Sequence, residues 1–172
     1  LKPSQKISKA LLVIGRIAYM KNGLRLLQSL ALFERKNGWV PTVRWAGRRE
    51  LDPESEAMKL AMDQFLLDHP KIAKHWVWIG EVTSVHQYFD KSDALVHVSL
   101  FEGLPNVVCE SMFARCPVIV SDVCDHSLLL GNGERGILCD PLSPISISNA
   151  IESFYKLEER EREAMVDRAY QF

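Results

Sequence analysis

The chain has 172 residues, enough for one domain of ordinary size with a hydrophobic core of its own. Hydrophobic residues make up 47% of it and charged residues 25%, a composition that excludes disordered and fibrous proteins. The formal net charge of −1 argues against a general nucleic-acid or membrane-surface binder, and the lack of an apolar run of about 18 residues predicts no membrane span.

Strand-like and helix-like segments alternate along the chain. Apolar or alternating runs indicate strands, and apolar residues at helical spacing behind capping residues indicate helices. In chain order the sequence predicts a strand over residues 10–15, a helix over 23–38, a strand over 40–47, a helix over 52–70, a strand over 75–80, a short helix over 84–92, a strand over 94–100, a helix over 105–114, strands over 117–122 and 136–140, and a helical segment over 143–172 that is broken near 156–158.

This alternation predicts an α/β fold, a three-layer, doubly wound sheet of about six mostly parallel strands in a single domain over residues 1–172. The predicted strands are apolar runs more than clean alternators, as expected when helices cover both faces of a parallel sheet. Ligands of such sheets bind at the carboxyl ends of the strands. We therefore expect one ligand-binding edge built from the segments that follow the strands: GRIAYMKNG, GRRE, GEVTS, SLFEGLP and SDVCDHS.

Two carboxylates on this edge flank an apolar segment. Glu102 follows the strand predicted over 94–100, and Glu110 lies about one turn into the next helix, in which Pro105 takes a first-turn position. A helix start offers N–H groups to a phosphate or sugar oxygen, and two carboxylates near it suit hydroxyl pairs such as those of a sugar or ribose. The alternative is that Glu102 caps the helix and Glu110 is a surface residue.

Two cations follow the first strand. Arg16 and Lys21 are the only charged residues among residues 12–22, and cations at the carboxyl end of a strand suit a diphosphate that is held without a metal. The chain has no D-x-D motif and no histidine–carboxylate cluster at ligand spacing, so the sequence predicts no metal and no other cofactor. The alternative is that both cations are solvated loop charges.

Other features are interpreted as structural. The G-x-G-x-x-G pattern over residues 131–136 precedes a predicted strand instead of opening a helix, which favours a tight turn over a dinucleotide site. His97 is interpreted as a strand histidine. Four tryptophans in or beside strands are interpreted as core residues: Trp39, Trp45, Trp76 and Trp78. No C-x-x-C pair occurs among the cysteines, which indicates free, mostly buried thiols in a reducing compartment, the cytoplasm: Cys109, Cys116, Cys124 and Cys139.

Together these segments resemble the C-terminal, donor-binding domain of group 1 (family 4) glycosyltransferases, which have the two-domain GT-B fold. The resemblance covers about residues 10–155, in the segments VIGRIAYMKNG, WAG, WIGEV, DALVHVSLFEGLPNVVCESMFARCPVIVSDV and GNGERGILCDP. It implies a Rossmann-like domain that binds a UDP-, GDP- or ADP-sugar. The implied activity is metal-independent, retaining glycosyl transfer to a glycan or lipid-linked acceptor in cell-surface polysaccharide synthesis.

The resemblance also implies roles for individual residues. Arg16 and Lys21 would hold the donor diphosphate and stabilise the charge on the departing nucleotide, and Glu102 would contact the hydroxyls of the donor sugar. Glu110 would hold the ribose diol. Further donor contacts would come from turns and from the helix start: Gly15, Gly80, Glu81, Val82, Gly103, Leu104, Asn106 and Val107.

Two positions depart from the family pattern. Arg115 stands where the family usually has glycine, in the turn before the strand over 117–122, and a non-glycine residue there can require a different backbone angle. His126 and Ser127 stand where an acid is common near the donor phosphates, so no role is assigned to them.

The resemblance implies that the chain is one half of an enzyme. The active site of the GT-B fold is a cleft between two domains, so we expect an acceptor-binding domain before Leu1, a final helix that continues past Phe172, and no transfer by the single domain. The expected partners are the nucleotide sugar and, through the other domain, the acceptor. Nucleic acid is not expected, and peripheral membrane association of the full-length enzyme is left open.

Two other functions stay open. A sugar-nucleotide epimerase of similar fold would bind the same donor. In a non-catalytic nucleotide-binding α/β module, Arg16, Lys21 and Glu102 would not converge. A Rossmann dehydrogenase is excluded because the loop after the first strand lacks a glycine-rich phosphate site.

Overall fold

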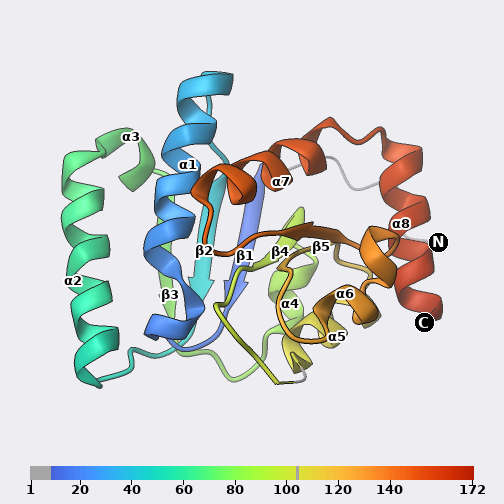
Figure 1. Ribbon diagram of the computed structural model, residues 1–172, viewed down its shortest axis with the longest axis horizontal. Coiled ribbons are helices and arrows are strands. Elements are labelled where there is room, and N and C mark those ends of the chain that lie inside the picture. The colour runs from blue at the N-terminus through green and yellow to red at the C-terminus, as the bar shows by residue number, and fades with distance from the viewer. Residues whose placement is uncertain (1–8, 104) are drawn as a thin grey trace.

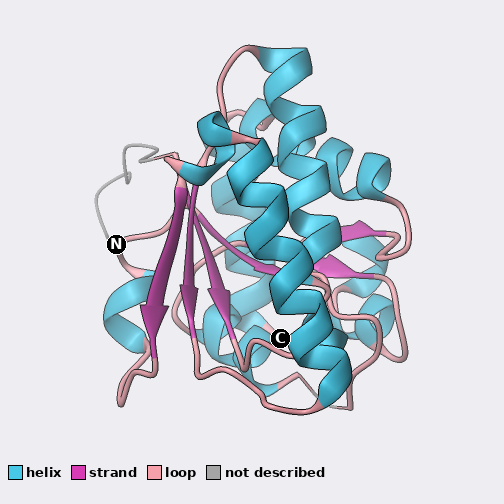
Figure 2. Cartoon of the chain, turned by 90° about the vertical axis from the view of Figure 1, so that its left-hand side faces the viewer, coloured by secondary structure: helices cyan, strands magenta, loops and turns pink. Residues whose placement is uncertain are grey.

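The computed structural model describes residues 9–103 and 105–172, so Leu104 and the lysine-containing residues 1–8 lie outside the described part. Six strands form one parallel sheet whose two faces are covered by helices, which confirms the predicted fold class (Figure 1). Figure 2 shows neighbouring strands that point the same way, as parallel pairing requires.

The order of the strands places a switch point in the middle of the sheet. The strands are β1 Ala10–Ile14, β2 Thr42–Ala46, β3 Trp76–Gly80, β4 Ala94–His97, β5 Val118–Ser121 and β6 Ile137–Cys139. Across the sheet they lie in the order β3-β2-β1-β4-β5-β6. The chain thus builds outward from β1 on one side and then from β4 on the other, so that the winding reverses between β1 and β4.

The helices follow the predicted segments, with differences at their ends. They are α1 Gly23–Asn37, α2 Pro53–Asp68, α3 Pro70–Ala73, α4 His86–Phe89, α5 Asn106–Phe113, α6 His126–Leu129, α7 Pro144–Lys156 and α8 Glu159–Gln171, with two 3₁₀ turns, η1 Tyr19–Lys21 and η2 Gly131–Gly133. In the part of the chain that the structure describes, no helix combines the length and the apolar character needed to cross a bilayer.

Two details of the predicted helices are wrong, and one short helix is absent from the prediction. The helix predicted over 52–70 stops at Asp68, and Pro70 starts a separate short helix, because proline disfavours a helical residue before it. Pro105 is the N-cap of α5 and does not lie in its first turn. The structure also contains α6, which the sequence did not predict because four residues are too few to show a helical periodicity. The turn predicted over residues 131–136 is confirmed, since η2 leads into β6.

Local sequence signals explain where the longer helices start. The Asp52 carboxylate accepts a hydrogen bond from the amide of Ser55 at 3.0 Å, and the Ser143 hydroxyl accepts one from the amide of Ser146 at 3.1 Å. The predicted break near 156–158 is confirmed, because α7 ends at Lys156 and Glu158 is the N-cap of α8, where it forms a capping box with Glu161.

Two hydrophobic cores lie on opposite faces of the sheet. Neighbouring residues of β1 point to different cores, Leu11 to the first and Leu12 to the second. Helices α1, α2, α3 and α7 supply the first core, and α4, α5 and α8 contribute to the second. This two-sided burial is why the strands read as continuous apolar runs.

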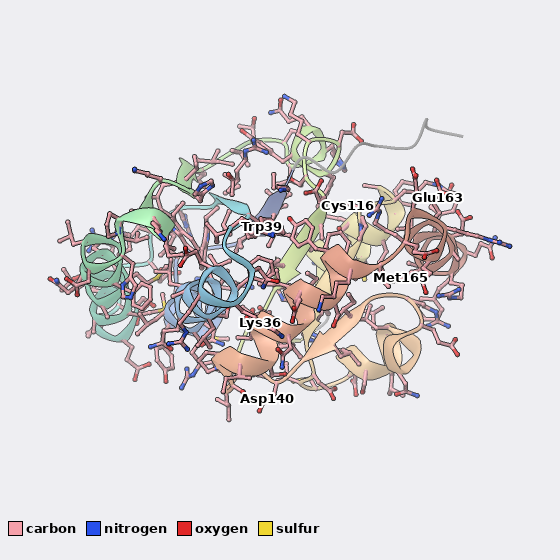
Figure 3. The ribbon with its side chains drawn as sticks, turned by 90° about the horizontal axis from the view of Figure 1, so that it is seen from above. Lys36, Trp39, Cys116, Asp140, Glu163 and Met165 are labelled. Atoms are coloured by element: carbon pink, nitrogen blue, oxygen red, sulfur yellow. The ribbon has the colours of Figure 1, made fainter. Side chains whose placement is uncertain are left out.

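Helix α7 packs beside α1 over the first core (Figure 1). Lys36 of α1 donates a hydrogen bond to Glu152 of α7 at 2.6 Å. Trp39 packs edge-on against Phe33 and Tyr155, with ring centroids 5.0 and 5.1 Å apart; Figure 3 labels Lys36 and Trp39. The interpretation of the tryptophans as core residues is confirmed: Trp45 and Trp76 are buried, and Trp39 and Trp78 are half-buried against the same core.

Arg115 keeps the backbone angle that favours glycine. Its φ is +58°, in the left-handed region, although its side chain carries a Cβ. The guanidinium pairs with Asp167 and lies 4.2 Å from the centre of the Tyr170 ring, both on α8. These contacts offset part of the backbone strain and attach the turn to α8.

All four cysteines are free, as the sequence predicts. Cys116 and Cys139 are buried, and burial raises the pKa of their thiols to about 11 and about 12. Cys109 is half-buried and Cys124 is exposed. The two buried thiols are therefore protonated and unreactive at neutral pH.

Candidate functional site

The carboxyl ends of β1 and β4 carry the candidate site. The two strands are parallel neighbours, with Leu11 paired to Ala94 and Leu12 to Leu95. Residues 15–22 (the β1 loop) and residues 98–103 (the β4 loop) follow them and meet at the switch point, where doubly wound sheets bind ligands.

Backbone and side-chain hydrogen bonds join the two loops. The amide of Leu100 donates to the carbonyl of Met20 at 2.8 Å. The side-chain amide of Asn22 donates to the carbonyls of Val98 at 3.0 Å and Pro141 at 2.7 Å. Asn22 is 3% exposed and has a left-handed φ of +60°, which asparagine tolerates well. Sequence reasoning missed Asn22; the available signal was an asparagine before a glycine at a helix start.

Two glycines let the β1 loop lie against its neighbours. A Cβ on Gly15 would lie 2.9 Å from Cε of Lys21, so the stem of Lys21 runs across this glycine. A Cβ on Gly47 would lie 1.9 Å from the carbonyl oxygen of Gly15. Any other residue at position 47 would therefore require the backbone to move. The same carbonyl accepts a hydrogen bond from Nε1 of Trp45 at 2.9 Å, which fixes the end of β1 to β2.

Lys21 and Glu102 form an ion pair across the two loops. They lie 81 positions apart in the chain, and Nζ of Lys21 donates a hydrogen bond to Oε1 of Glu102. Both side chains are largely enclosed, 19% and 18% exposed. Burial alone would raise the pKa of Glu102, but hydrogen bonds from His97, Lys21 and Ser99 outweigh it and lower this pKa from 4.5 to about 2. Glu102 is therefore ionised at neutral pH.

His97 lies in β4, as predicted, and its side chain touches the candidate site. It is the last residue of the strand and is 3% exposed. Its Nε2 lies 3.4 Å from Oε1 of Glu102. Burial is the main cause that lowers the pKa of His97, so its imidazole is neutral at pH 7.

Arg16 takes a different direction from Lys21. Its side chain is 59% exposed and donates a hydrogen bond to Glu50, which follows β2. The β1 loop is also held to this neighbouring segment by a bridge between Ile17 and Arg49. Of the three residues expected to converge, the structure thus brings together Lys21 and Glu102, and places Arg16 in a separate exposed pair.

The other predicted site residues that the structure describes lie at the end of β3 or follow β3 or β4 in the chain. Gly80 ends β3, and its carbonyl accepts a hydrogen bond from the amide of Gly47 at 2.8 Å. Glu110 is exposed, about one turn into α5. The remaining candidates are exposed or half-buried, except Leu104, which lies outside the described residues: Glu81, Val82, Gly103, Asn106 and Val107.

Two further features bear on what the chain can hold. Among residues 9–103 and 105–172, no group of three His, Cys, Asp or Glu side chains is placed to bind a metal ion. A groove of about 680 Å³ opens between α1, α2 and α3, with Leu32, Phe65 and Ile72 among its lining residues. None of the predicted site residues lines this groove.

The fold and the polar cluster define a class: a Rossmann-like α/β domain with a cation–carboxylate pair at the switch point of its sheet. The sequence profile of the family described as "Glycosyl transferases group 1" matches residues 2–172. The chain belongs to this family, which confirms the resemblance seen in its motifs.

Curated relatives are longer than this chain. It is 25% identical over 126 residues to the capsular polysaccharide biosynthesis glycosyltransferase CapH of Staphylococcus aureus, a match that covers 73% of the chain and 34% of CapH. It is 26% identical over 137 residues to EpsD of Bacillus subtilis (strain 168), covering 78% of the chain and 33% of EpsD. The chain thus spans about a third of the length of these relatives.

Solved structures share the fold at low sequence identity. Alr3699/HepE of Anabaena, in complex with UDP and glucose, superimposes with a TM-score of 0.81 at 18% identity, over 94% of this chain and 42% of that chain. The C-terminal domain of LpcC, a group 1 glycosyl transferase protein of Francisella tularensis, gives 0.76 at 18% identity, over 94% of this chain and 82% of that domain. These likenesses establish the GT-B-type Rossmann-like fold.

Proposed function

We propose that the chain is the donor-binding domain of a glycosyltransferase that uses a nucleotide-diphosphate sugar. The observation that carries this proposal is the meeting of Lys21 and Glu102 at the switch point of the sheet. A cation suits the diphosphate and a carboxylate suits the sugar hydroxyls, and the two groups lie side by side as those two parts of the donor do. The family membership and the UDP and glucose in the Anabaena structure support it.

Leaving-group stabilisation is the proposed chemical role of the β1 loop. When the bond between the sugar and the diphosphate breaks, negative charge grows on the departing nucleotide. Nζ of Lys21 is the enclosed cation at this site, and Arg16 would add a second charge after release from Glu50. Fixed cations can supply this stabilisation without a metal ion, in keeping with the metal-independent, retaining reaction that we propose.

The start of α5 is the proposed binding element for the rest of the donor. The first-turn amides of a helix have no acceptor within it, so those of Asn106 and Val107 are suited to phosphate or sugar oxygens. The exposed carboxylate of Glu110 would bind the ribose diol, and the turn from Gly80 to Val82 would face the base.

The acceptor and the pathway complete the proposal. The chain spans about a third of CapH and EpsD, and we propose that it is the donor half of a two-domain cytoplasmic enzyme whose other half binds a glycan or lipid-linked acceptor. The name of CapH, a capsular polysaccharide enzyme, supports a role in cell-surface polysaccharide synthesis.

A calorimetric and thermal-shift screen of the 172-residue chain with UDP-glucose, GDP-mannose and ADP-glucose tests the proposal. We expect one nucleotide to bind, and Lys21→Ala and Glu110→Ala each to weaken that binding. Loss of Lys21 should weaken it roughly 10- to 100-fold, the size expected for a charge-assisted hydrogen bond. Arg16→Ala should cost less, because Arg16 must first leave Glu50.

Matched substitutions far from the site serve as controls. Lys71→Ala removes an exposed lysine that pairs with Glu34, and Glu163→Ala removes an exposed acid of α8. Both should bind the donor as the wild-type chain does. Binding that survives Lys21→Ala and Glu110→Ala unchanged would remove the proposed site. Product analysis of the bound sugar nucleotide distinguishes the epimerase, which would isomerise the sugar.

A further inference from the structure

Glu102 is contacted by a buried histidine that the proposed reaction does not use. We infer that His97 is a positioning residue, which holds the Glu102 carboxylate in place for the donor sugar while Lys21 turns to the diphosphate. The inference rests on the proposed role of Glu102 in sugar binding and adds to it the group that keeps this carboxylate oriented.

The contacts place His97 next to the Glu102 carboxylate. Its Nε2 lies 3.4 Å from Oε1 of Glu102 and 3.5 Å from the hydroxyl of Ser99, which also donates to Glu102. These distances are longer than the usual hydrogen-bond range of about 2.7 to 3.2 Å. Long contacts of this kind are common at ligand-free sites and shorten when the ligand binds.

Further contacts surround the backbone and the ring of His97. Its carbonyl accepts a hydrogen bond from the hydroxyl of Ser121 at 3.4 Å. Its ring lies 5.9 Å from the ring of His126, centre to centre, and Nδ1 of His126 lies 2.8 Å from the carbonyl oxygen of Ser121. Both histidines are buried, His126 at 1% exposed. A side chain enclosed in this way has few other rotamers and can orient its partner.

The protonation state follows from the surroundings. Four groups from three elements face His97: Lys21 from the β1 loop, Ser99 and Glu102 from the β4 loop, and His126 from α6. A neutral imidazole carries one N–H, and the contact with a carboxylate, which only accepts, assigns that proton to Nε2. His97 thus donates to Glu102 without adding a charge next to Lys21.

This arrangement separates two tasks at the site. In the ligand-free chain the Lys21 ammonium neutralises Glu102. A diphosphate carries more negative charge than one carboxylate and competes for that ammonium. Once Lys21 turns, Glu102 loses one donor and keeps His97 and Ser99, so its oxygens stay fixed for sugar hydroxyls.

The test measures how much the sugar adds to binding. For the nucleotide that the wild-type chain binds, the dissociation constants of the nucleoside diphosphate and of its sugar form are compared by calorimetry. His97→Leu should reduce the ratio between them about tenfold and leave the affinity for the diphosphate alone within about twofold. His97→Gln, whose side-chain amide nitrogen reaches the position of Nε2, should restore the wild-type ratio, and His97→Asn, whose amide stops short of it, should not.

A double-mutant cycle with Glu102→Ala shows whether His97 acts through Glu102. In the Glu102→Ala background, His97→Gln and His97→Asn should bind the nucleotide sugar equally well, because the group that they position is gone. These two variants keep a polar side chain at the site and decide the matter even if His97→Leu does not fold.

The outcomes separate this inference from the proposed function. A wild-type chain that binds no nucleotide sugar overturns both. A chain that binds the sugar nucleotide with the same ratio in wild type, His97→Gln and His97→Asn overturns the positioning role and leaves the proposed function in place. The positioning role is also overturned if His97→Asn weakens binding of the nucleotide sugar as much in the Glu102→Ala background as in the wild-type chain. The histidine would then act independently of Glu102.

Discussion

Hydrogen-bond donors, more than burial, determine the pKa of Glu102. Glu102 is 18% exposed and burial opposes its charge, yet donors from His97, Lys21 and Ser99 lower its pKa to about 2. Glu110 is exposed and available to a ligand from outside. The two acids that flank the apolar segment 103–109 therefore have different environments, although the sequence presents them as a symmetric pair.

The charge of Glu102 links stability to pH. Its pKa is lower in the folded chain than the ordinary 4.5, so its stabilising effect is complete above about pH 4.5 and is lost as the pH falls toward 2. Glu102→Gln should lower the free energy of unfolding by about 1 to 3 kcal/mol at pH 7 and by less at pH 3. Urea unfolding at the two pH values measures this. Glu163→Gln on the exposed side of α8 is the control, and an equal loss at both pH values would contradict the ionised pair.

At the scale of elements, close contacts between loops set the geometry of the site. The β1 loop lies against the end of β2 through Gly47 and against the β4 loop through Asn22. Helix α5 carries Glu110 and starts at Asn106, shortly after the β4 loop. Each contact joins segments that are distant in the chain, which is why it left only faint signals in the sequence.

The contact at Gly47 can be tested by stability. A Cβ at this position would lie 1.9 Å from the carbonyl oxygen of Gly15, so Gly47→Ala must push the ends of β1 and β2 apart. We expect a loss of about 2 kcal/mol or more in the free energy of unfolding. Gly103→Ala is the matched control, because a Cβ there meets nothing within 4 Å, and it should change stability by less than about 0.5 kcal/mol. Equal effects of the two substitutions would show that the loops do not pack this closely.

At the scale of the whole molecule, one sheet separates two hydrophobic cores, which pack on its opposite faces. The first core contains or contacts all four tryptophans, and the second contains none. Since every strand contributes backbone hydrogen bonds to the same sheet, we expect the two cores to unfold together.

The tryptophans make this cooperativity measurable. Leu95→Ala removes a fully buried side chain of β4 from the second core and should destabilise the chain by about 2 to 5 kcal/mol. Tryptophan fluorescence, which reports the first core, should show the same shift of the urea midpoint as far-UV circular dichroism. Leu128→Ala, at a leucine 69% exposed, should leave both unchanged. Midpoints that separate in Leu95→Ala would mean that the two cores unfold independently.

Local patterns were sufficient to predict the elements and the class of fold. Apolar runs, helical spacing and caps such as Asp52 act between residues near in the chain, so six strands and the longer helices could be predicted from them. The rule that ligands bind where parallel strands end then placed Lys21 and Glu102 at one edge, and the structure pairs them.

What the amino-acid sequence determined by itself is therefore the alternation of strands and helices, the edge that carries the polar residues, and the family. Only the tertiary structure decided that Arg16 turns to Glu50 while Lys21 turns to Glu102, and that His97 contacts this carboxylate. The reason is physical: these contacts depend on which loops become neighbours after the sheet has formed, and on side-chain directions that no local spacing encodes.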